Sequence, residues 1–410
     1  MDTVVGVRAS DERRSAALPE QRPPVLTPED LVPDCPPLRI LHLAEAFGGG
    51  LMEMTVALAE ASSRRGHDVL IGYGIRPETP ADVRDRIDAR IEVRQLPWTR
   101  RSPGAQLRAA REIRRLIRAW RPDIVHLHSS FAGLVGSMVI DERIPLVYSP
   151  HAFASALPEA GKLRASLFRA GERRTCRRVA AVGAVSSSEA ALAWDLGASH
   201  VLRVRNGIRE LDPDVVHTRS ADDPPPDPAR IVAAGRTVPQ RLPEACAGIL
   251  SQVRDVAEVE WLGGGGGARG VEGRQALEAA GIPLSGWLPR PELLGRLRDA
   301  TAYLHWTAWD GLPLSVLEAI ALDVVVVASD IPPNREILGE DSVCASEEEA
   351  VALLRRVVED PLFAEEMRMV QRARREAFSA DHMATLWHRA YERVLAPEPD
   401  AMLVPVPVPA

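Results

Sequence analysis

Cysteine is scarce in this chain, which has four among 410 residues, all far apart in the sequence. Neither a C-x-x-C pair nor a disulfide-type spacing connects them, so we expect reduced thiols rather than a metal site. Apolar runs are short as well, because none approaches the roughly 20 residues that span a bilayer. The acidic, proline-containing N-terminus does not resemble a signal peptide. These absences predict a cytoplasmic protein, whose contact with a membrane, if any, is peripheral.

An excess of positive charge is also lacking. The chain has 50 Lys and Arg against 57 Asp and Glu, a net charge of −7. Such a balance argues against nucleic acid as a partner. Hydrophobic residues make up 46% and charged residues 26%, as in a folded globular protein, and the length suffices for two domains of ordinary size.

Two stretches of the chain, residues 38–210 and 230–379, alternate apolar strand patterns with helical ones. Strands that alternate with helices predict parallel sheets covered on both faces. We therefore expect an α/β protein with two Rossmann-like, doubly wound domains. Open sheets of this kind bind ligands at the carboxyl ends of their strands, so the site should lie in a central cleft between the domains.

The remaining segments have the composition of linkers and tails. Residues 1–37 show no apolar periodicity and predict a flexible N-terminal extension, and residues 211–229, with Pro224-Pro225-Pro226, predict an interdomain linker. Residues 380–395 have helical spacing. Residues 396–410 alternate proline with small residues and predict a disordered tail.

The most informative stretch follows a short apolar strand at residues 302–306. Gly311 and Pro313 interrupt regular structure, and helical spacing resumes at residues 314–322. A strand, a turn and a helix start together direct backbone N–H groups and the helix dipole at an anion. Asp310 on the loop and Glu318 about one turn into the helix are placed to reach hydroxyls of one ligand. A sugar nucleotide combines a diphosphate with such hydroxyls.

Further segments match, in order, motifs of the retaining nucleotide-sugar glycosyltransferases of family 4, which have the two-domain GT-B fold. The loop resembles the family's E-G-x-P and E-x7-E pattern, here D-x7-E. The other matching segments are Gly48-Gly49-Gly50, Pro122-Asp123-Ile124-Val125-His126-Leu127-His128, Ser149-Pro150-His151-Ala152-Phe153, Val204-Arg205-Asn206-Gly207-Ile208, Ala234-Gly235-Arg236 with Pro239-Gln240-Arg241, and Val327-Ala328-Ser329-Asp330 with Asn334-Arg335-Glu336. Together they span roughly residues 38 to 338.

The resemblance implies transfer of a sugar from a nucleotide-diphosphate donor, most simply a UDP-sugar, to an acceptor hydroxyl with retention. It implies no metal and no other cofactor, and a role in glycan, polysaccharide or glycoconjugate biosynthesis. The C-terminal domain would hold the donor, and residues 380–395 would cross back to the N-terminal domain. The implied catalytic residues are His151, Asp310, Arg236 and Arg241. The implied donor-binding residues are Gly49, Gly50, Arg236, Arg241, Asp310, Gly311, Leu312, Pro313 and Glu318.

Some positions depart from the family pattern. Asp310 is one methylene shorter than the usual Glu, which reduces its reach to the sugar hydroxyls. Arg241 replaces Lys and so presents a fork of donors instead of a point charge. Asp323 stands where Gly is common after the helix, and Pro332-Pro333 precedes Asn334 in place of Gly. The five glycines at 263–267 exceed the usual G-x-G and predict a flexible loop that contacts the nucleotide.

Two helical segments of the N-terminal half, residues 105–120 and 161–178, are rich in arginine. The second has seven basic residues against a single acid, Glu172. A solvated helix face explains such a pattern, and a surface for anionic lipid near a lipid-linked acceptor explains it as well.

Three alternatives remain from the sequence. The chain could be a nucleotide-sugar epimerase of the same fold, or a binding protein without turnover. His126 and His128 lie on one side of a strand, a spacing that also suits a metal, although no Asp, Glu or Cys nearby in the sequence completes a site.

Overall fold

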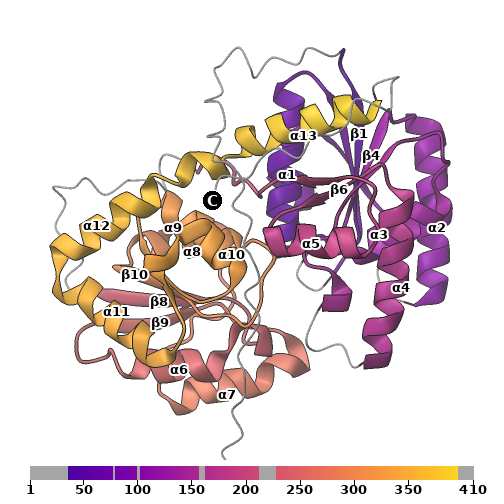
Figure 1. Ribbon diagram of the computed structural model, residues 1–410. Coiled ribbons are helices and arrows are strands. Elements are labelled where there is room, and N and C mark those ends of the chain that lie inside the picture. Colours follow the sequence, from indigo (N-terminus) through magenta and orange to yellow (C-terminus); the bar gives the residue numbers. More distant parts are fainter. Residues whose placement is uncertain (1–35, 77–78, 99–101, 157–161, 212–227, 396–410) are drawn as a thin grey trace, which may run out of the picture.

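The computed structural model describes residues 36–76, 79–98, 102–156, 162–211 and 228–395. Most of the expected N-terminal extension, most of the expected linker and the expected C-terminal tail lie outside these ranges. The described residues form two α/β halves, each built on its own sheet (Figure 1).

The N-terminal half contains a seven-stranded parallel sheet in the order β3-β2-β1-β4-β5-β6-β7. The order reverses between β1 and β4, the position at which doubly wound sheets bind ligands. The strands are β1 (Arg39–Ala44), β2 (Asp68–Tyr73), β3 (Glu92–Gln95), β4 (Ile124–His128), β5 (Leu146–Ser149), β6 (Ala181–Ala184) and β7 (Val201–Arg203). The helices are α1 (Gly49–Arg64), α2 (Pro103–Trp120), α3 (Ser130–Val139), α4 (Lys162–Arg178) and α5 (Ser187–Asp195).

The C-terminal half contains a five-stranded parallel sheet in the order β12-β11-β10-β8-β9. Its strands are β8 (Arg230–Ala234), β9 (Glu258–Leu262), β10 (Ala302–His305), β11 (Val325–Ser329) and β12 (Val343–Cys344). Its helices are α6 (Pro243–Ser251), α7 (Val271–Ala279), α8 (Arg290–Arg298), α9 (Leu314–Ala321), α10 (Pro332–Leu338), α11 (Glu347–Glu359) and α12 (Pro361–Arg372).

The central strands are buried along their whole length because helices cover both faces of each sheet. Every residue of β4, β10 and β11 is buried. This is why β11 reads as an apolar run in the sequence rather than as an alternating pattern, and why the histidines of β4 and β10 are buried. The expected pair of doubly wound domains is therefore confirmed.

The last helix, α13 (Ala380–Leu395), packs on the N-terminal half beside α1 (Figure 1). Its Tyr391 hydroxyl lies 2.7 Å from Nδ1 of His126 on β4. Trp387 lies so close to β6 that a Cβ at Gly183 would come within 2.0 Å of its ring, so only glycine fits there. The helix therefore completes the core of the other half.

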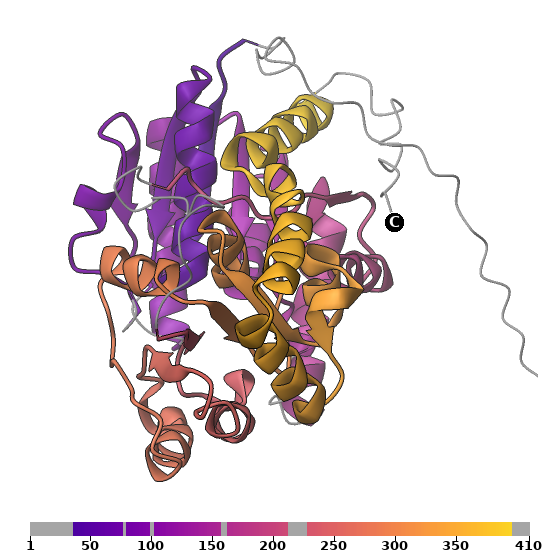
Figure 2. The ribbon, with the colours of Figure 1, turned by 90° about the vertical axis from the view of Figure 1, so that its left-hand side faces the viewer.

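The chain passes between the halves at two adjacent places. The first is next to Asn206-Gly207 and the second is at Ser379, where an isolated parallel bridge joins Ile208 to Ser379. A Cβ at Gly207 would lie 2.3 Å from the Ser379 carbonyl oxygen, which explains the glycine of this motif by close approach. Figure 2 shows α13 running from the C-terminal half to α1 in a perpendicular view.

Candidate active site

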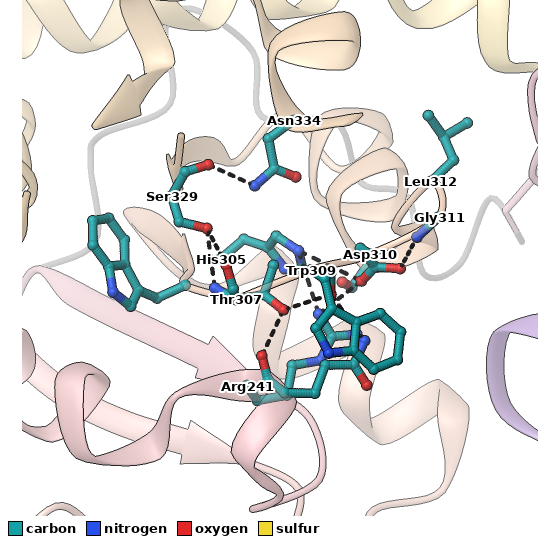
Figure 3. Close-up of polar contacts among 12 residues, drawn as sticks. Arg241, His305, Thr307, Trp309, Asp310, Gly311, Leu312, Ser329 and Asn334 are labelled. Carbon is teal, nitrogen blue, oxygen red and sulfur yellow. Dashed lines mark hydrogen bonds and ion pairs between the residues drawn. The ribbon is translucent and has the colours of Figure 1, made fainter. Parts of the chain in front are cut away.

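Asp310 lies on the loop between β10 and α9, and both of its carboxylate oxygens accept hydrogen bonds (Figure 3). Arg241 Nη1 donates to Oδ2 at 2.9 Å, and the backbone N–H of Gly311 donates to Oδ1 at 2.8 Å. The two side chains of the ion pair are partly exposed, Arg241 at 21% and Asp310 at 16%. The structure thus joins an acid and a base that are 69 positions apart in the sequence.

A buried histidine contacts the arginine of this pair. His305, at the end of β10, places Nε2 3.3 Å from Arg241 Nη1, and its Nδ1 lies 3.1 Å from the Tyr303 hydroxyl. Burial, and then the charge of Arg241, hold the pKa of His305 well below its ordinary value. The ring is therefore neutral, and its Nε2 can accept a hydrogen bond from the arginine.

Side chains from neighbouring strand ends hold the loop that carries Asp310 (Figure 3). Thr307 Oγ1 lies 2.8 Å from the Gln240 carbonyl oxygen and 3.0 Å from that of Trp309. Ser329 Oγ, at the end of β11, accepts from the Thr307 N–H at 3.0 Å. Asn334 in turn donates to the Ser329 carbonyl at 2.8 Å. These bonds fix the loop at the carboxyl end of the sheet.

Glu318 on α9 is buried and paired with an arginine that the sequence did not suggest. Arg290 Nη1 donates to Glu318 Oε1 at 2.5 Å, and its Nε lies 3.5 Å from Glu53 on α1. Arg209 lies 2.8 Å from the same Glu53. Burial raises the pKa of Glu318, and Arg290 opposes that rise. Acidic and basic side chains therefore alternate from Glu318 on α9 to Glu53 on α1.

The first turns of α1 and α9 lie against each other. Gly49 has φ 53°, a left-handed conformation that favours glycine, and it begins α1. A Cβ at Gly50 would lie 3.5 Å from Leu314 Cδ1, at the start of α9. Pro313 precedes that helix, and Asn206 Nδ2 donates to the Leu312 carbonyl at 3.3 Å. Two helix N-termini, the positive ends of their helix dipoles, thus come together where the halves meet.

His151 lies in a turn with an unusual backbone after β5. Its φ is 50° and that of Ala152 is 80°, both in the left-handed region. Glu189 accepts from the N–H groups of Ala152 and Val185, each at 2.7 Å, and holds the turn. Burial raises the pKa of this carboxyl to about 7. A Cβ at Gly311 would lie 3.6 Å from the carbonyl carbon of His151, so the turn adjoins the Asp310 loop.

Three further histidines lie behind His151. Its Nε2 is 3.1 Å from His128 Nδ1, and His128 Nε2 is 3.0 Å from Nδ1 of His42 on β1. Possible ligand atoms of His42, His126 and His128 lie within 4.8 Å of one another. His42 is thus a third candidate ligand for the metal site that the sequence left incomplete at His126 and His128. Both ring nitrogens of His126, however, already have partners, the Tyr391 hydroxyl and Ser149 Oγ at 2.9 Å.

Arg236 follows β8 and is exposed, so it is less enclosed than Arg241. The loop of five glycines follows β9 and touches the loop after β8. A Cβ at Gly263 would lie 2.5 Å from the Gly235 carbonyl oxygen, and Thr237 Oγ1 donates to the Gly265 carbonyl at 3.0 Å. Both loops therefore lie at the same edge of the sheet as Asp310.

Known families and structures match this architecture. The family profile described as "Glycosyltransferase Family 4" matches residues 48–209, and that described as "Glycosyl transferases group 1" matches residues 224–376. Each profile covers one of the two halves. Both halves are thus glycosyltransferase domains, and the chain is a two-domain glycosyltransferase with the GT-B fold.

Solved structures show the same fold at low sequence identity. Sucrose-phosphate synthase from Thermosynechococcus elongatus is 15% identical, with a TM-score of 0.73 over 88% of this chain and 100% of that one. HepE from Anabaena, in complex with UDP and glucose, is 15% identical, with a TM-score of 0.70 over 86% of this chain and 99% of that one. An E. coli protein described as trehalose-6-phosphate, bound with UDP-2-fluoro glucose, is 12% identical, with a TM-score of 0.64 over 87% of this chain and 99% of that one.

Among the described residues, no helix is both long enough and apolar enough to cross a membrane.

Proposed function

We propose that this protein transfers a sugar from a nucleotide-diphosphate donor to an acceptor hydroxyl, with retention at the anomeric carbon. UDP is the proposed carrier because two proteins of similar fold, HepE and the E. coli protein, were solved with UDP or a UDP-sugar. Retention is supported by the sequence motifs shared with family 4. Biosynthesis of a glycan, polysaccharide or glycoconjugate is the corresponding role.

One observation carries the proposal: the Arg241–Asp310 pair at the start of α9, beside the first turn of α1. A leaving diphosphate gains negative charge as the glycosidic bond breaks. A fixed guanidinium and two helix N-termini supply positive potential at that place without reorganisation. Arg236 would add a second cation from the exposed side. With these cations present, the proposed chemistry uses no metal and no other cofactor.

Asp310 is the proposed partner of sugar hydroxyls on the donor. Its two oxygens are engaged by Arg241 and Gly311, so it binds the ligand through their remaining lone pairs. Leu312 and Pro313 shape the same loop, and Gly49 and Gly50 let the diphosphate approach the α1 backbone. Glu318 is the proposed acceptor for ribose hydroxyls, with Arg290 keeping it ionised.

His151 is proposed to contact the donor sugar from the N-terminal half. Its turn adjoins Gly311, and the left-handed backbone, held by Glu189, projects the residue away from regular structure. Backbone strain of this kind is typical of functional sites.

The acceptor is proposed to be lipid-linked and to be reached from a basic surface formed by α2 and α4. Both helices pack against α3. Leu163 and Leu167 on α4 are 79% and 67% exposed among the arginines. A separate depression of about 770 Å³, at the C-terminal ends of α2 and α3, is lined by residues that include Arg114, Arg118, Arg121 and Arg143. Exposed apolar side chains within a basic surface suit anionic headgroups over an acyl layer.

A thermal-shift panel tests the donor assignment. UDP, GDP, ADP and their sugar conjugates are added to the full chain, because a ligand that binds only the folded state raises its melting temperature. We expect UDP and a UDP-sugar to give the largest shifts, and Arg241→Ala to abolish them. The exposed Arg274 on α7 supplies a matched control, Arg274→Ala, that should leave the shifts intact. No shift with any nucleotide would contradict the assignment.

Turnover then separates the proposal from its two rivals. A transferase releases nucleoside diphosphate in proportion to glycosylated acceptor when a membrane lipid extract is supplied. An epimerase would change the sugar without consuming an acceptor. A binding protein would give thermal shifts but no product.

A further inference from the structure

A row of three histidines runs from the candidate active site into the core of the N-terminal half. His151, His128 and His42 meet through nitrogen–nitrogen contacts of 3.1 and 3.0 Å. The ring planes are inclined by only 18° and 28°, and the ring centroids lie 5.4 and 5.2 Å apart. Because the nitrogens are much closer than the centroids, the rings meet edge to edge, as hydrogen-bonded imidazoles do.

All three rings are neutral. Burial lowers the pKa values of His42 and His151 to about 3, and it holds that of His128 well below its ordinary value. A neutral imidazole carries one proton, so one of its nitrogens donates and the other accepts. Each contact in the row must then contain one proton, since two protons would clash and none would leave two facing lone pairs.

Only two proton arrangements satisfy both conditions. In the first, every ring is protonated on Nδ1, so His42 donates to His128, His128 donates to His151, and His151 presents Nδ1–H at its far side. In the second, every ring is protonated on Nε2, and His151 presents a bare lone pair at Nδ1. The tautomer of His42 at one end of the row therefore determines the tautomer of His151 at the other.

The buried end decides between them. His42 is 0% exposed, and its Nε2 has no hydrogen-bond partner within the part of the chain that the structure describes. The first arrangement leaves a lone pair at this nitrogen, and the second leaves an N–H group. An orphaned N–H is the rarer of the two in folded proteins. The first arrangement is thus the more stable one.

We propose that His42 and His128 are positioning residues that set the tautomer of His151, so that His151 offers Nδ1–H as a hydrogen-bond donor to an oxygen of the donor substrate. The proposal rests on the transferase function for the identity of that oxygen, a sugar hydroxyl or the leaving phosphate. The tautomer itself does not depend on it. No proton is transferred along the row during turnover, because the row ends in the core.

The ring nitrogens of ¹⁵N-histidine-labelled protein, without any ligand, provide the first test. Signals of His151 are assigned by their loss in His151→Asn. We expect the protonated nitrogen of His151 to be Nδ1 in the wild type. In His42→Asp the carboxylate can only accept, so His128 must donate from Nε2 and His151 should carry its proton on Nε2 instead of Nδ1. His42→Asn, whose amide can still donate to His128, should keep Nδ1–H. Protonation at Nε2 in the wild type, or an unchanged tautomer in His42→Asp, would overturn the proposal.

Turnover of the proposed reaction provides the second test. Loss of one ordered neutral hydrogen bond corresponds to about a two- to tenfold fall in kcat. We expect such a fall in His42→Asp, with recovery in His42→Asn and little change in KM. His67 serves as the matched control, because it is also a buried histidine whose Nε2 has no partner among the described residues, but its Nδ1 accepts from the Leu38 N–H. His67→Asp should leave the tautomer of His151 unchanged.

The two failures are distinguishable. If the wild type neither binds nucleotide sugars nor turns them over, the transferase function fails, and the NMR result still decides the tautomer. If the tautomer changes as expected but a folded His42→Asp variant keeps full kcat, the role assigned to the row is wrong while the transferase function stands.

Discussion

Removal of the Arg241 guanidinium should slow turnover far more than it weakens folding. The pair with Asp310 is neither fully exposed nor fully buried, at 21% and 16% exposure. Exposed pairs contribute roughly 0.2–1 kcal/mol, and breaking a buried pair costs about 3–5 kcal/mol. For Arg241→Ala we therefore expect a loss of about 1–3 kcal/mol in the free energy of unfolding. A domain with about 5–15 kcal/mol of stability remains folded after such a loss.

The kinetic effect has a different origin and a larger size. A preorganised group that stabilises developing charge is typically worth about 10²–10³ in rate. Arg241→Ala should therefore lower kcat by about that factor, measured as release of nucleoside diphosphate. Arg241→Lys keeps the charge but loses the planar guanidinium, whose Nη1 contacts both His305 and Asp310, so its rate should be intermediate. Arg236→Ala should likewise lower turnover, with a smaller effect on stability because its side chain is exposed.

Urea unfolding and initial rates on the same preparations compare the two effects, with Arg274→Ala as the control for loss of an exposed arginine. The reasoning is refuted if Arg241→Ala is folded and retains near-wild-type turnover. It is also refuted if its loss of activity is fully explained by the fraction of unfolded protein.

Three further predictions concern metal, membranes and pH. Activity should survive EDTA, since arginines neutralise the diphosphate, and loss on chelation with rescue by Mg²⁺ or Mn²⁺ would contradict this. The chain should cosediment with anionic vesicles at low salt and not at high salt, because each cation near such a surface contributes about 1 kcal/mol that salt screens. Charge reversal of Arg111, Arg115, Arg173 and Arg177 should abolish this binding. No binding at low salt would contradict the membrane proposal. Finally, Glu189 has a folded-state pKa of about 7, above the ordinary 4.5, so the folded state holds its proton more tightly and stability falls as pH rises between these values. Glu189 should contribute a fall of about 3 kcal/mol in the free energy of unfolding, measured by urea unfolding, and Glu189→Gln should lack it. Equal pH dependence in the two proteins would show that Glu189 does not titrate in this range.

Sequence patterns were sufficient for the architecture because buried parallel strands and their covering helices have distinct periodicities. They were not sufficient for β3, whose residues Glu92–Gln95 carry no apolar run since the strand lies at the edge of the sheet. The loop around Asp310 was recognisable from the Gly and Pro that shape it. Its contact with Arg241 could be expected only from the family, because spacing in sequence does not tell which strand ends are neighbours.

Buried and half-buried polar groups were the hardest to foresee. His42, Glu189 and Arg290 lie in ordinary strand and helix patterns, and their partners come from distant segments. Only the order of the strands, which places β1 beside β4, brings His42 to His128. A histidine within an otherwise apolar strand was the available signal, and His42 and His305 both carry it.

One departure from the family pattern has a physical explanation. Asp323 stands where glycine is common, and its φ of 59° is the left-handed conformation that glycine adopts freely. Asp tolerates this region better than most residues. Its buried carboxylate also accepts from Arg372 Nε at 2.7 Å, and Arg368 donates to its carbonyl at 3.1 Å. The side chain thus compensates for the strain of the backbone.

The adjacent crossings at Ile208 and Ser379 make the second half an insertion within the first. Its two ends leave and re-enter at one point, while the first half is assembled from residues before 208 and after 379. A fragment that starts near residue 209 and stops near 379 would retain every strand of its own sheet. A fragment of residues 36–208 alone would lack α13. It would therefore lose Trp387 and Tyr391 and would expose the groove that they fill beside His126. The two halves therefore differ in how they can be produced separately. The C-terminal half can be expressed as one continuous segment, whereas the N-terminal half requires its two segments to be joined.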